Sequence, residues 1–297
     1  MLLPKTEMLR SGETIDTLST SGAIEAFLRD QVVAIEAVAG VAVEIEAGAN
    51  AMAAAVQRGN SLIYAAAGSS GLMALADASE LSGTFGIEDK IIHIHMAGGT
   101  PVNGKMVGDT EDDIFAGAAV GSTIACGDVV IVLSASGTTP YAIAAAKSAK
   151  ERGGIIIGLA NNPATELLDI SDIAICIETP PEVIAGSTRL SAATAQKAAL
   201  NLMSSLMGIK LGHVYKGFMV NVVADNAKLL NRAVGIISQI TNVKMPDAHD
   251  AMMQANGNTK IAILIAAGCP ADKAIEALTV NDGDLNECFE LLKLKQD

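Results

Sequence analysis

The chain has 297 residues; half are hydrophobic and 18% are charged, so it can bury a core and lacks the composition of a disordered protein. Twenty Lys and Arg against 33 Asp and Glu give a formal net charge of −13, and aromatic residues make up only 3% of the chain. This composition argues against nucleic acid as a partner, because surfaces that bind nucleic acid are usually basic and often carry aromatic side chains.

Metal and membrane sites are not expected from the sequence. The four cysteines and four histidines do not follow the spacing of a metal site or of a disulfide framework. We therefore expect no metal and no cofactor. The first residues do not resemble a secretory signal, and no uncharged apolar stretch is long enough for a membrane span. These features favour a cytoplasmic protein without a membrane partner.

Residues 1–20 are polar, and the run from Ala23 to Arg58 is rich in Ala, Val, Ile and Glu, which predicts one or two long helices. Five short, mostly apolar runs follow, as expected for buried parallel strands: Ser61–Ala67, Lys90–Met96, Asp128–Ser134, Gly154–Ala160 and Asp172–Glu178. Ala-rich helical patterns such as Gly71–Leu81 and Pro140–Arg152 lie between most of them. This alternation predicts an α/β fold with a doubly wound, five-stranded parallel sheet.

The chain becomes helical again after Arg189, through Lys197–Leu211 and Asn221–Thr241. Beyond Thr241, turn signals separate short segments with helical spacing, which predicts a small C-terminal helical subdomain of three or four helices. That tail could also bind a partner or cover the site, but a small helical core explains its apolar spacing more simply. We therefore divide the chain into an N-terminal arm with helices (1–58), a sheet domain (59–241) and a C-terminal helical subdomain (242–297).

Three segments are rich in Gly and hydroxyl side chains: Gly68–Gly71, Ser134–Pro140 and Gly186–Arg189. The first two directly follow predicted strands, where open α/β sheets bind ligands near helix N-termini. In the second, Thr139 suits the cap of a helix and Pro140 its first position. Any one of these segments could be only a turn. Together, their hydroxyl groups favour a phosphate or polyhydroxyl ligand.

Two acidic segments follow the first and second predicted strands. Asp77 and Glu80 are spaced to lie near each other on one helix, where solvated acids are common. Glu111–Asp113 could be an acidic helix start. The nearby segment Gly99–Met106 has the spacing of a nucleotide P-loop, but Met106 stands where a hydroxyl is needed, so we predict no nucleotide site.

In their order along the chain, these segments resemble the N-acetylmuramic acid 6-phosphate etherases, a family of the sugar isomerase (SIS) superfamily. The similarity extends from about Thr6 to about Thr241, and the C-terminal tail resembles the extension of that family. The resemblance is carried by the following motifs: Gly68–Gly71, Asp77–Glu80, Thr84–Gly86, Ala97–Gly99, Glu111–Asp113, Ser134–Gly137, Thr139–Tyr141, Asn162–Pro163, Gly186–Leu190 and Thr194–Lys197.

The resemblance implies a SIS-type, flavodoxin-like domain over residues 59–241 and a lyase that removes D-lactate from a phosphorylated amino sugar during cell-wall recycling. It implies that Glu80 protonates the leaving ether oxygen and that Glu111 removes the proton at C2. The family works as a homodimer with the site near the interface, and needs neither metal nor cofactor. The sugar phosphate would contact these residues: Ser69, Ser70, Ser134, Ser136, Gly137, Thr138, Thr139, Ser187 and Thr188.

Three positions depart from the family pattern. Leu72 and Thr138 stand where the family usually has Arg, and Ser191 stands where it usually has Lys. Either hydroxyl groups and a helix end hold the phosphate, or the ligand carries less negative charge. Two alternatives to the etherase therefore stay open: a SIS isomerase or lyase for a different sugar acid, and a non-catalytic regulator that binds a sugar phosphate.

Overall fold

A computed structural model of the chain describes residues 3–12, 14–101, 103–222 and 227–294. The chain forms two compact units. The first unit contains Met1–Ala78 and Lys90–Ser204, and the second contains Ser79–Asp89 and Ser205–Asp297. Within the described ranges, no helix is both long and apolar enough to cross a membrane. The predicted division at residues 58 and 241 stays a prediction.

The first unit is built on a five-stranded sheet, as predicted. Its strands are β1 (Leu62–Ala66), β2 (Ile92–Met96), β3 (Val129–Ser134), β4 (Ile155–Ala160) and β5 (Ile173–Cys176). They pair in parallel in the order β2-β1-β3-β4-β5. Because β2 lies on one side of β1 while β3, β4 and β5 follow on the other, the direction of winding reverses between β1 and β3.

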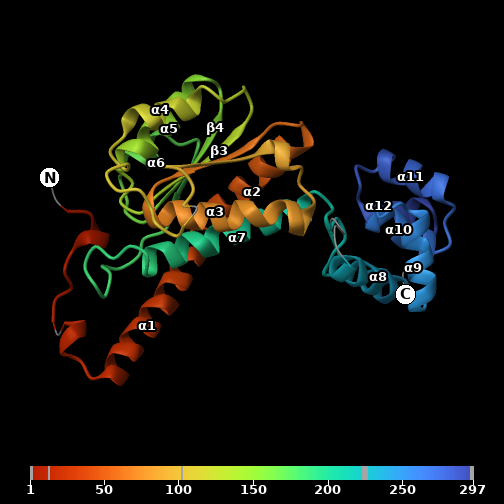
Figure 1. The fold of residues 1–297 in the computed structure, drawn as a ribbon, viewed down its shortest axis with the longest axis horizontal. Helices are drawn as coiled ribbons and strands as arrows, with labels where there is room; N and C mark the ends of the chain where they lie inside the picture. The colour runs from red at the N-terminus through yellow and green to blue at the C-terminus, as the bar shows by residue number, and fades with distance from the viewer. Residues whose placement is uncertain (1–2, 13, 102, 223–226, 295–297) are drawn as a thin grey trace. The chain divides into compact units, whose positions relative to one another are not determined.

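Helices cover both faces of this sheet (Figure 1). They include α2 (Ala42–Gln57) on one face, and α4 (Ile114–Gly121), α5 (Pro140–Glu151) and α6 (Glu166–Ile170) on the other. Val130 and Val132 of β3 share a buried apolar cluster with Ala145 and Ala149 of α5. Alternate strand residues point to the same face, and small alanine side chains let the helix lie close to the sheet. This packing explains the high alanine content of the helical segments.

The N-terminal region contains two short 3₁₀ helices, η1 (Lys5–Glu7) and η2 (Ile15–Thr17), followed by α1 (Thr20–Ala39). The Ser19 hydroxyl caps α1 by accepting a hydrogen bond from the amide of Gly22. Arg10 pairs with the buried carboxylate of Asp30 in α1, and its Nε donates to the Pro181 carbonyl at 2.6 Å. The predicted run Ala23–Arg58 therefore forms two helices, α1 and α2.

Two long helices, α3 (Gly68–Phe85) and α7 (Ser191–Lys210), begin in the first unit. The second unit contains a two-stranded hairpin and five helices among its described residues: β6 (Val214–Tyr215), β7 (Phe218–Met219), α8 (Ala227–Thr241), α9 (Met245–Gln254), α10 (Thr259–Ala266), α11 (Ala271–Val280) and α12 (Leu285–Leu291). A third 3₁₀ turn, η3 (Asp89–Ile91), precedes β2. The four helices α9–α12 form the predicted C-terminal helical subdomain. The hairpin was not predicted.

Candidate active site

The first two Gly- and hydroxyl-rich segments lie at the carboxyl edge of the sheet. The first loop, Gly68–Gly71, follows β1, and the second loop, Ser134–Thr139, follows β3. These two strands flank the point where the winding direction reverses, which is where open α/β sheets leave a crevice for ligands. The parallel strands therefore bring the first two predicted loops to adjacent places.

Glu111 lies against the first loop. Gly68 is the first residue of α3 and has a positive φ of 54°; a Cβ atom at this position would lie 2.5 Å from Oε1 of Glu111. Glycine is therefore required both by the backbone conformation and by the approach of the carboxylate. The Glu111 side chain is exposed, so a ligand can reach it.

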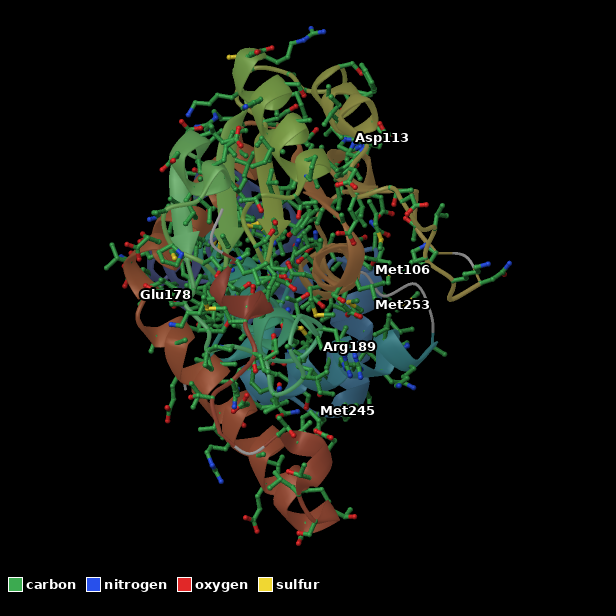
Figure 2. The ribbon with its side chains drawn as sticks, turned by 90° about the vertical axis from the view of Figure 1, so that its left-hand side faces the viewer. Met106, Asp113, Glu178, Arg189, Met245 and Met253 are labelled. Atoms are coloured by element: carbon green, nitrogen blue, oxygen red, sulfur yellow. The ribbon has the colours of Figure 1, made fainter. Side chains whose placement is uncertain are left out.

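The backbone of Glu111 also connects to the second loop. Its carbonyl accepts a hydrogen bond of 3.0 Å from the amide of Tyr141, the second residue of α5. Burial, together with the nearby Asp113 carboxylate, raises the pKa of Tyr141, so this side chain stays neutral. Asp113 caps α4 by accepting from the amide of Ala116, and Figure 2 labels it at the start of that helix. The predicted acidic helix start is thus present, with Glu111 just before it.

The second loop is organised by its own hydroxyl groups. Ser134 is 2% exposed; its Oγ accepts from the amide of Gly137 at 3.0 Å and shares a hydrogen bond of 2.8 Å with Oγ1 of Thr139. As predicted, Thr139 precedes α5 and Pro140 opens it, although the Thr139 side chain bonds Ser134 rather than capping the helix. Ser134 therefore shapes the loop.

Other groups of the second loop remain accessible. Ser136 Oγ accepts from both the amide and the hydroxyl of Thr138, each at 3.2 Å, and Thr138 is exposed. Gly137 has a φ of 72°, and a Cβ atom there would collide with the Thr165 side chain, 2.3 Å from its Oγ1. This contact requires glycine at position 137 and leaves Ser136 and Thr138 as the outward-facing hydroxyl groups.

The third loop, Gly186–Arg189, meets the N-terminal segment. A Cβ atom on Gly186, which has a φ of 74°, would lie 2.8 Å from Oε2 of Glu7. Ser187 and Thr188 are half-buried in this loop. Sequence reasoning did not predict that the N-terminal segment would contribute to this edge.

The two acids of α3 have different surroundings. Asp77 is 4% exposed and accepts hydrogen bonds from Tyr64, Asn201 and Ser204 at 2.7–3.0 Å. Burial raises the pKa of Asp77, and these hydrogen bonds oppose the shift. Glu80 is exposed. Since α3 is continuous and Glu80 is twelve residues beyond Gly68, helix geometry puts a rise of about 18 Å between these positions.

Comparison with known proteins decides the family. Residues 114–206 match the SIS domain family. The chain is 39% identical to an N-acetylmuramic acid 6-phosphate etherase of Deinococcus radiodurans over 89% of this chain and 88% of that protein. It is 38% identical to the protein of the same name from Shouchella clausii, over 89% and 90%. The chain belongs to the N-acetylmuramic acid 6-phosphate etherase family.

A solved structure shows the same fold. A Bacteroides fragilis protein, named for a phosphosugar isomerase involved in capsule formation, superposes with a TM-score of 0.51 over 67% of this chain and 95% of its own. Only 16% of the residues are identical, so this similarity concerns the fold alone. The SIS-type fold predicted from the resemblance is confirmed.

The three departures from the etherase family pattern lie in different environments. Leu72 is half-buried in the first turns of α3, and Thr138 is exposed in the second loop. Ser191 is fully buried at the start of α7, where the buried carboxylate of Glu182 accepts from its amide at 2.9 Å. No cation is therefore contributed by these positions.

Proposed function

We propose that this chain is a carbon–oxygen lyase that cleaves the D-lactyl ether of N-acetylmuramic acid 6-phosphate. The products are N-acetylglucosamine 6-phosphate and D-lactate. The curated relatives support this activity, since they carry the etherase name over about nine-tenths of the chain. The proposal includes a cytoplasmic reaction in the recycling of cell-wall amino sugars, as the family resemblance implies.

The position of Glu111 is the observation that carries the proposal. Its exposed carboxylate lies against Gly68 at the start of α3, at the edge of the sheet where the winding direction reverses between β1 and β3. In the open-chain aldehyde, Glu111 would remove the proton from C2. The electron pair of the broken C2–H bond then forms the C2–C3 double bond as the C3–O bond breaks. An acid, assigned to Glu80, protonates the departing lactate oxygen. Water then adds at C3 and a proton returns to C2, which restores the sugar.

The hydroxyl-rich loops would hold the sugar phosphate. The hydroxyl groups of Ser136, Thr138 and Thr139 are assigned to the phosphate, next to the N-terminus of α5, because helix N-termini favour anions. Gly137 is assigned to the same subsite as the position where the loop turns, since its amide donates to Ser134. Ser134 supports these contacts through its bonds within the loop. The groups assigned to the sugar are Ser69, Ser70, Ser187 and Thr188.

A homodimer would supply the two carboxylates to one site. Helix α1 extends away from the sheet (Figure 1), and its uncovered apolar residues recur at helical spacing, as expected for a face that packs on a second copy. They are Ile24, Leu28, Val32 and Ile35, which are 49–61% exposed. Because a rise of about 18 Å separates Glu80 from Gly68, where Glu111 rests, we assign Glu80 in each site to the partner copy.

Release of D-lactate tests the activity directly. Purified protein incubated with N-acetylmuramic acid 6-phosphate should release D-lactate, and Glu111→Gln should lower kcat at least about 100-fold, the usual contribution of a general base. Glu151→Gln, at the exposed end of α5, serves as the matched control and should leave the rate unchanged. No lactate from the wild type, or full activity in Glu111→Gln, would contradict the proposal.

Mixing inactive subunits tests the shared site. Glu80→Gln and Glu111→Gln proteins, refolded together, form hybrid dimers in which one site keeps both wild-type carboxylates if each site draws on two copies. Random pairing then restores about a quarter of the wild-type activity. If both carboxylates act within one copy, every hybrid site lacks one of them and the mixture stays inactive.

The missing cations favour a second candidate, a regulator that binds sugar phosphates without turnover. Leu72 and Ser191 offer no charge to an anionic ligand. This candidate predicts that N-acetylmuramic acid 6-phosphate binds in calorimetry while no D-lactate appears. An isomerase or a lyase for another sugar acid would instead convert a different sugar phosphate in a product screen.

A further inference from the structure

We propose that Lys5, on the N-terminal 3₁₀ helix, supplies the cation that recognises the phosphate of the ligand. This inference rests on the proposed sugar-phosphate function and deepens it. The starting observation is a cavity of about 940 Å³ lined by Ser136 and Thr138 of the second loop, by Asn162–Thr165, and by the N-terminal segment. Among the described residues that line it, Lys5 is the single charged one.

The N-terminal segment is attached to the second loop by a buried pair of side chains. Thr6 is fully buried; its amide donates to Oδ1 of Asn162 at 3.4 Å, and Nδ2 of Asn162 donates to the Thr6 hydroxyl at 3.0 Å. The same Nδ2 donates to the carbonyl of Ala135 at 2.8 Å. Lys5 is thus one residue away from Thr6, which Asn162 links to the second loop at Ala135.

The Lys5 ammonium group can move to a ligand at little cost. Its Nζ lies 3.7 Å from Oε2 of Glu178, with the two side chains 46% and 54% exposed. Exposed pairs of this kind contribute about 0–1 kcal/mol. The four-carbon stem is flexible and the ammonium has three donors, so it can turn from one carboxylate to a doubly charged phosphate ester.

A second lysine lies near the same hydroxyl group but in a less suitable setting. Lys147 lines a separate cavity of about 360 Å³ with Thr138, and its Nζ bonds Oε1 of Glu166, which lines that cavity too. The carboxylate there opposes a phosphate, whereas none of the described residues that line the cavity of Lys5 carries a carboxylate. Lys147 is therefore the rival that the experiment has to separate from Lys5.

Thr165 also lines the Lys5 cavity, but its hydroxyl oxygen is buried against the second loop. Thr165 is 6% exposed and its Oγ1 has no hydrogen-bond partner in the described structure. It packs beneath Gly137, so it lies directly under the second loop. One cation and the two outward hydroxyl groups of Ser136 and Thr138 therefore line one cavity, a combination that suits a phosphate monoester.

Binding of the reaction product tests the inference without turnover. Titration calorimetry with N-acetylglucosamine 6-phosphate and with N-acetylglucosamine gives the preference for the phosphate. Lys5→Met keeps the stem and the Thr6 anchor, and should weaken binding of the phosphate ester about 10- to 30-fold while leaving the unphosphorylated sugar unchanged. Lys5→Arg should retain most of the preference.

Lys150→Met is the matched control, because Lys150 is also 46% exposed and also pairs with a carboxylate, that of Asp172. It should leave both affinities unchanged. An unchanged preference in Lys5→Met, or its loss in Lys147→Met instead, would overturn the role of Lys5 while leaving the sugar-phosphate function standing. If the wild type itself shows no preference for the phosphate ester, both the proposed function and this inference fail.

Discussion

Polar side chains gather in two regions of the molecule, and the two differ in their access to water. At the carboxyl edge of the first unit, Glu111 and Thr138 are exposed. In the second unit, Lys260 is only 6% exposed and donates to the Gly283 carbonyl at 2.8 Å. Exposed groups can exchange water for a ligand, whereas buried groups are committed to the folded structure.

Around Lys260 in the second unit, burial disfavours the charged forms of the side chains. Burial lowers the pKa of Lys260 to about 8, although the Asp284 carboxylate opposes this shift. Burial and the nearby Lys260 lower the pKa of His213 to about 4, and its Nδ1 has no hydrogen-bond partner in the described structure. The comparison teaches that changes at the sheet edge should alter activity, while changes in this buried region should alter stability and its dependence on pH.

Gly68→Ala should have the largest effect on activity. The new Cβ would lie 2.5 Å from Oε1 of Glu111, so the carboxylate has to shift by about 1 Å to reach ordinary van der Waals contact. A displacement of about 1 Å at a reacting group typically lowers the rate about 100-fold. We therefore expect kcat/KM for lactate release to fall by about this factor, measured by a coupled D-lactate assay.

Gly59→Ala separates this contact from backbone strain. Gly59 also has a positive φ, 74°, but a Cβ atom there meets nothing within 4 Å. Both variants should lose about 1–2 kcal/mol of stability from the left-handed conformation, and only Gly68→Ala should lose activity. Equal losses of activity in the two variants would show that the position of Glu111 is not what Gly68 protects.

His213→Gln should flatten the dependence of stability on pH. Because the folded-state pKa of His213, about 4, lies below its ordinary value of 6.5, the unfolded chain binds the extra proton as the pH falls between these values. The contribution of His213 to wild-type stability is therefore greatest above pH 6.5 and is lost toward pH 4, by on the order of 2 kcal/mol for this half-buried group. Urea unfolding at pH 7 and 4.5 measures the change.

His249→Gln is the control for that experiment, since His249 is exposed on α9 of the same unit. It should keep the wild-type decline. If His213→Gln declines as steeply as the wild type, another buried group governs the acid sensitivity and the distinction between the two regions weakens.

Strands and the first two loops were predictable because their signals are local. The buried run predicted as Ser61–Ala67 forms β1 from Leu62 to Ala66, and parallel strands bring the loops that follow them to one edge. The hairpin Val214–Met219 was missed, since its strands have two residues each and its turn, Lys216–Gly217, lacks the usual Asn-Gly or Asp-Gly signal.

Contacts across long sequence separations were not predictable. Thr6 bonds Asn162, 156 residues away, and nothing in the residues around Lys5 indicates that partner. Glu111 was identified from its motif, but the segment between β2 and α4 is too long and irregular for its contact with Gly68 to be inferred. Asp77 and Glu80 lie three residues apart on α3, as expected, but their spacing did not indicate that Asp77 is buried and Glu80 exposed. Hydrogen bonds from Tyr64, Asn201 and Ser204 allow the Asp77 carboxylate to be buried.

Ser134→Ala should have the smallest effect. It tests the comparison between exposed and buried polar groups, because Ser134 belongs to the candidate site but is itself buried. The variant removes the side-chain acceptor of the Gly137 amide, which keeps the Ser134 carbonyl, and leaves the Thr139 hydroxyl without its Ser134 partner; this costs about 1 kcal/mol of stability. We expect KM to rise about 3- to 10-fold, with kcat little changed, because the loop that holds the phosphate loosens while Glu111 stays in place. Ser122→Ala, which removes an exposed hydroxyl bonded to the Ala119 carbonyl, should change neither constant. A fall in kcat at constant KM would instead mean that Ser134 acts on the reacting atoms rather than on the shape of the loop.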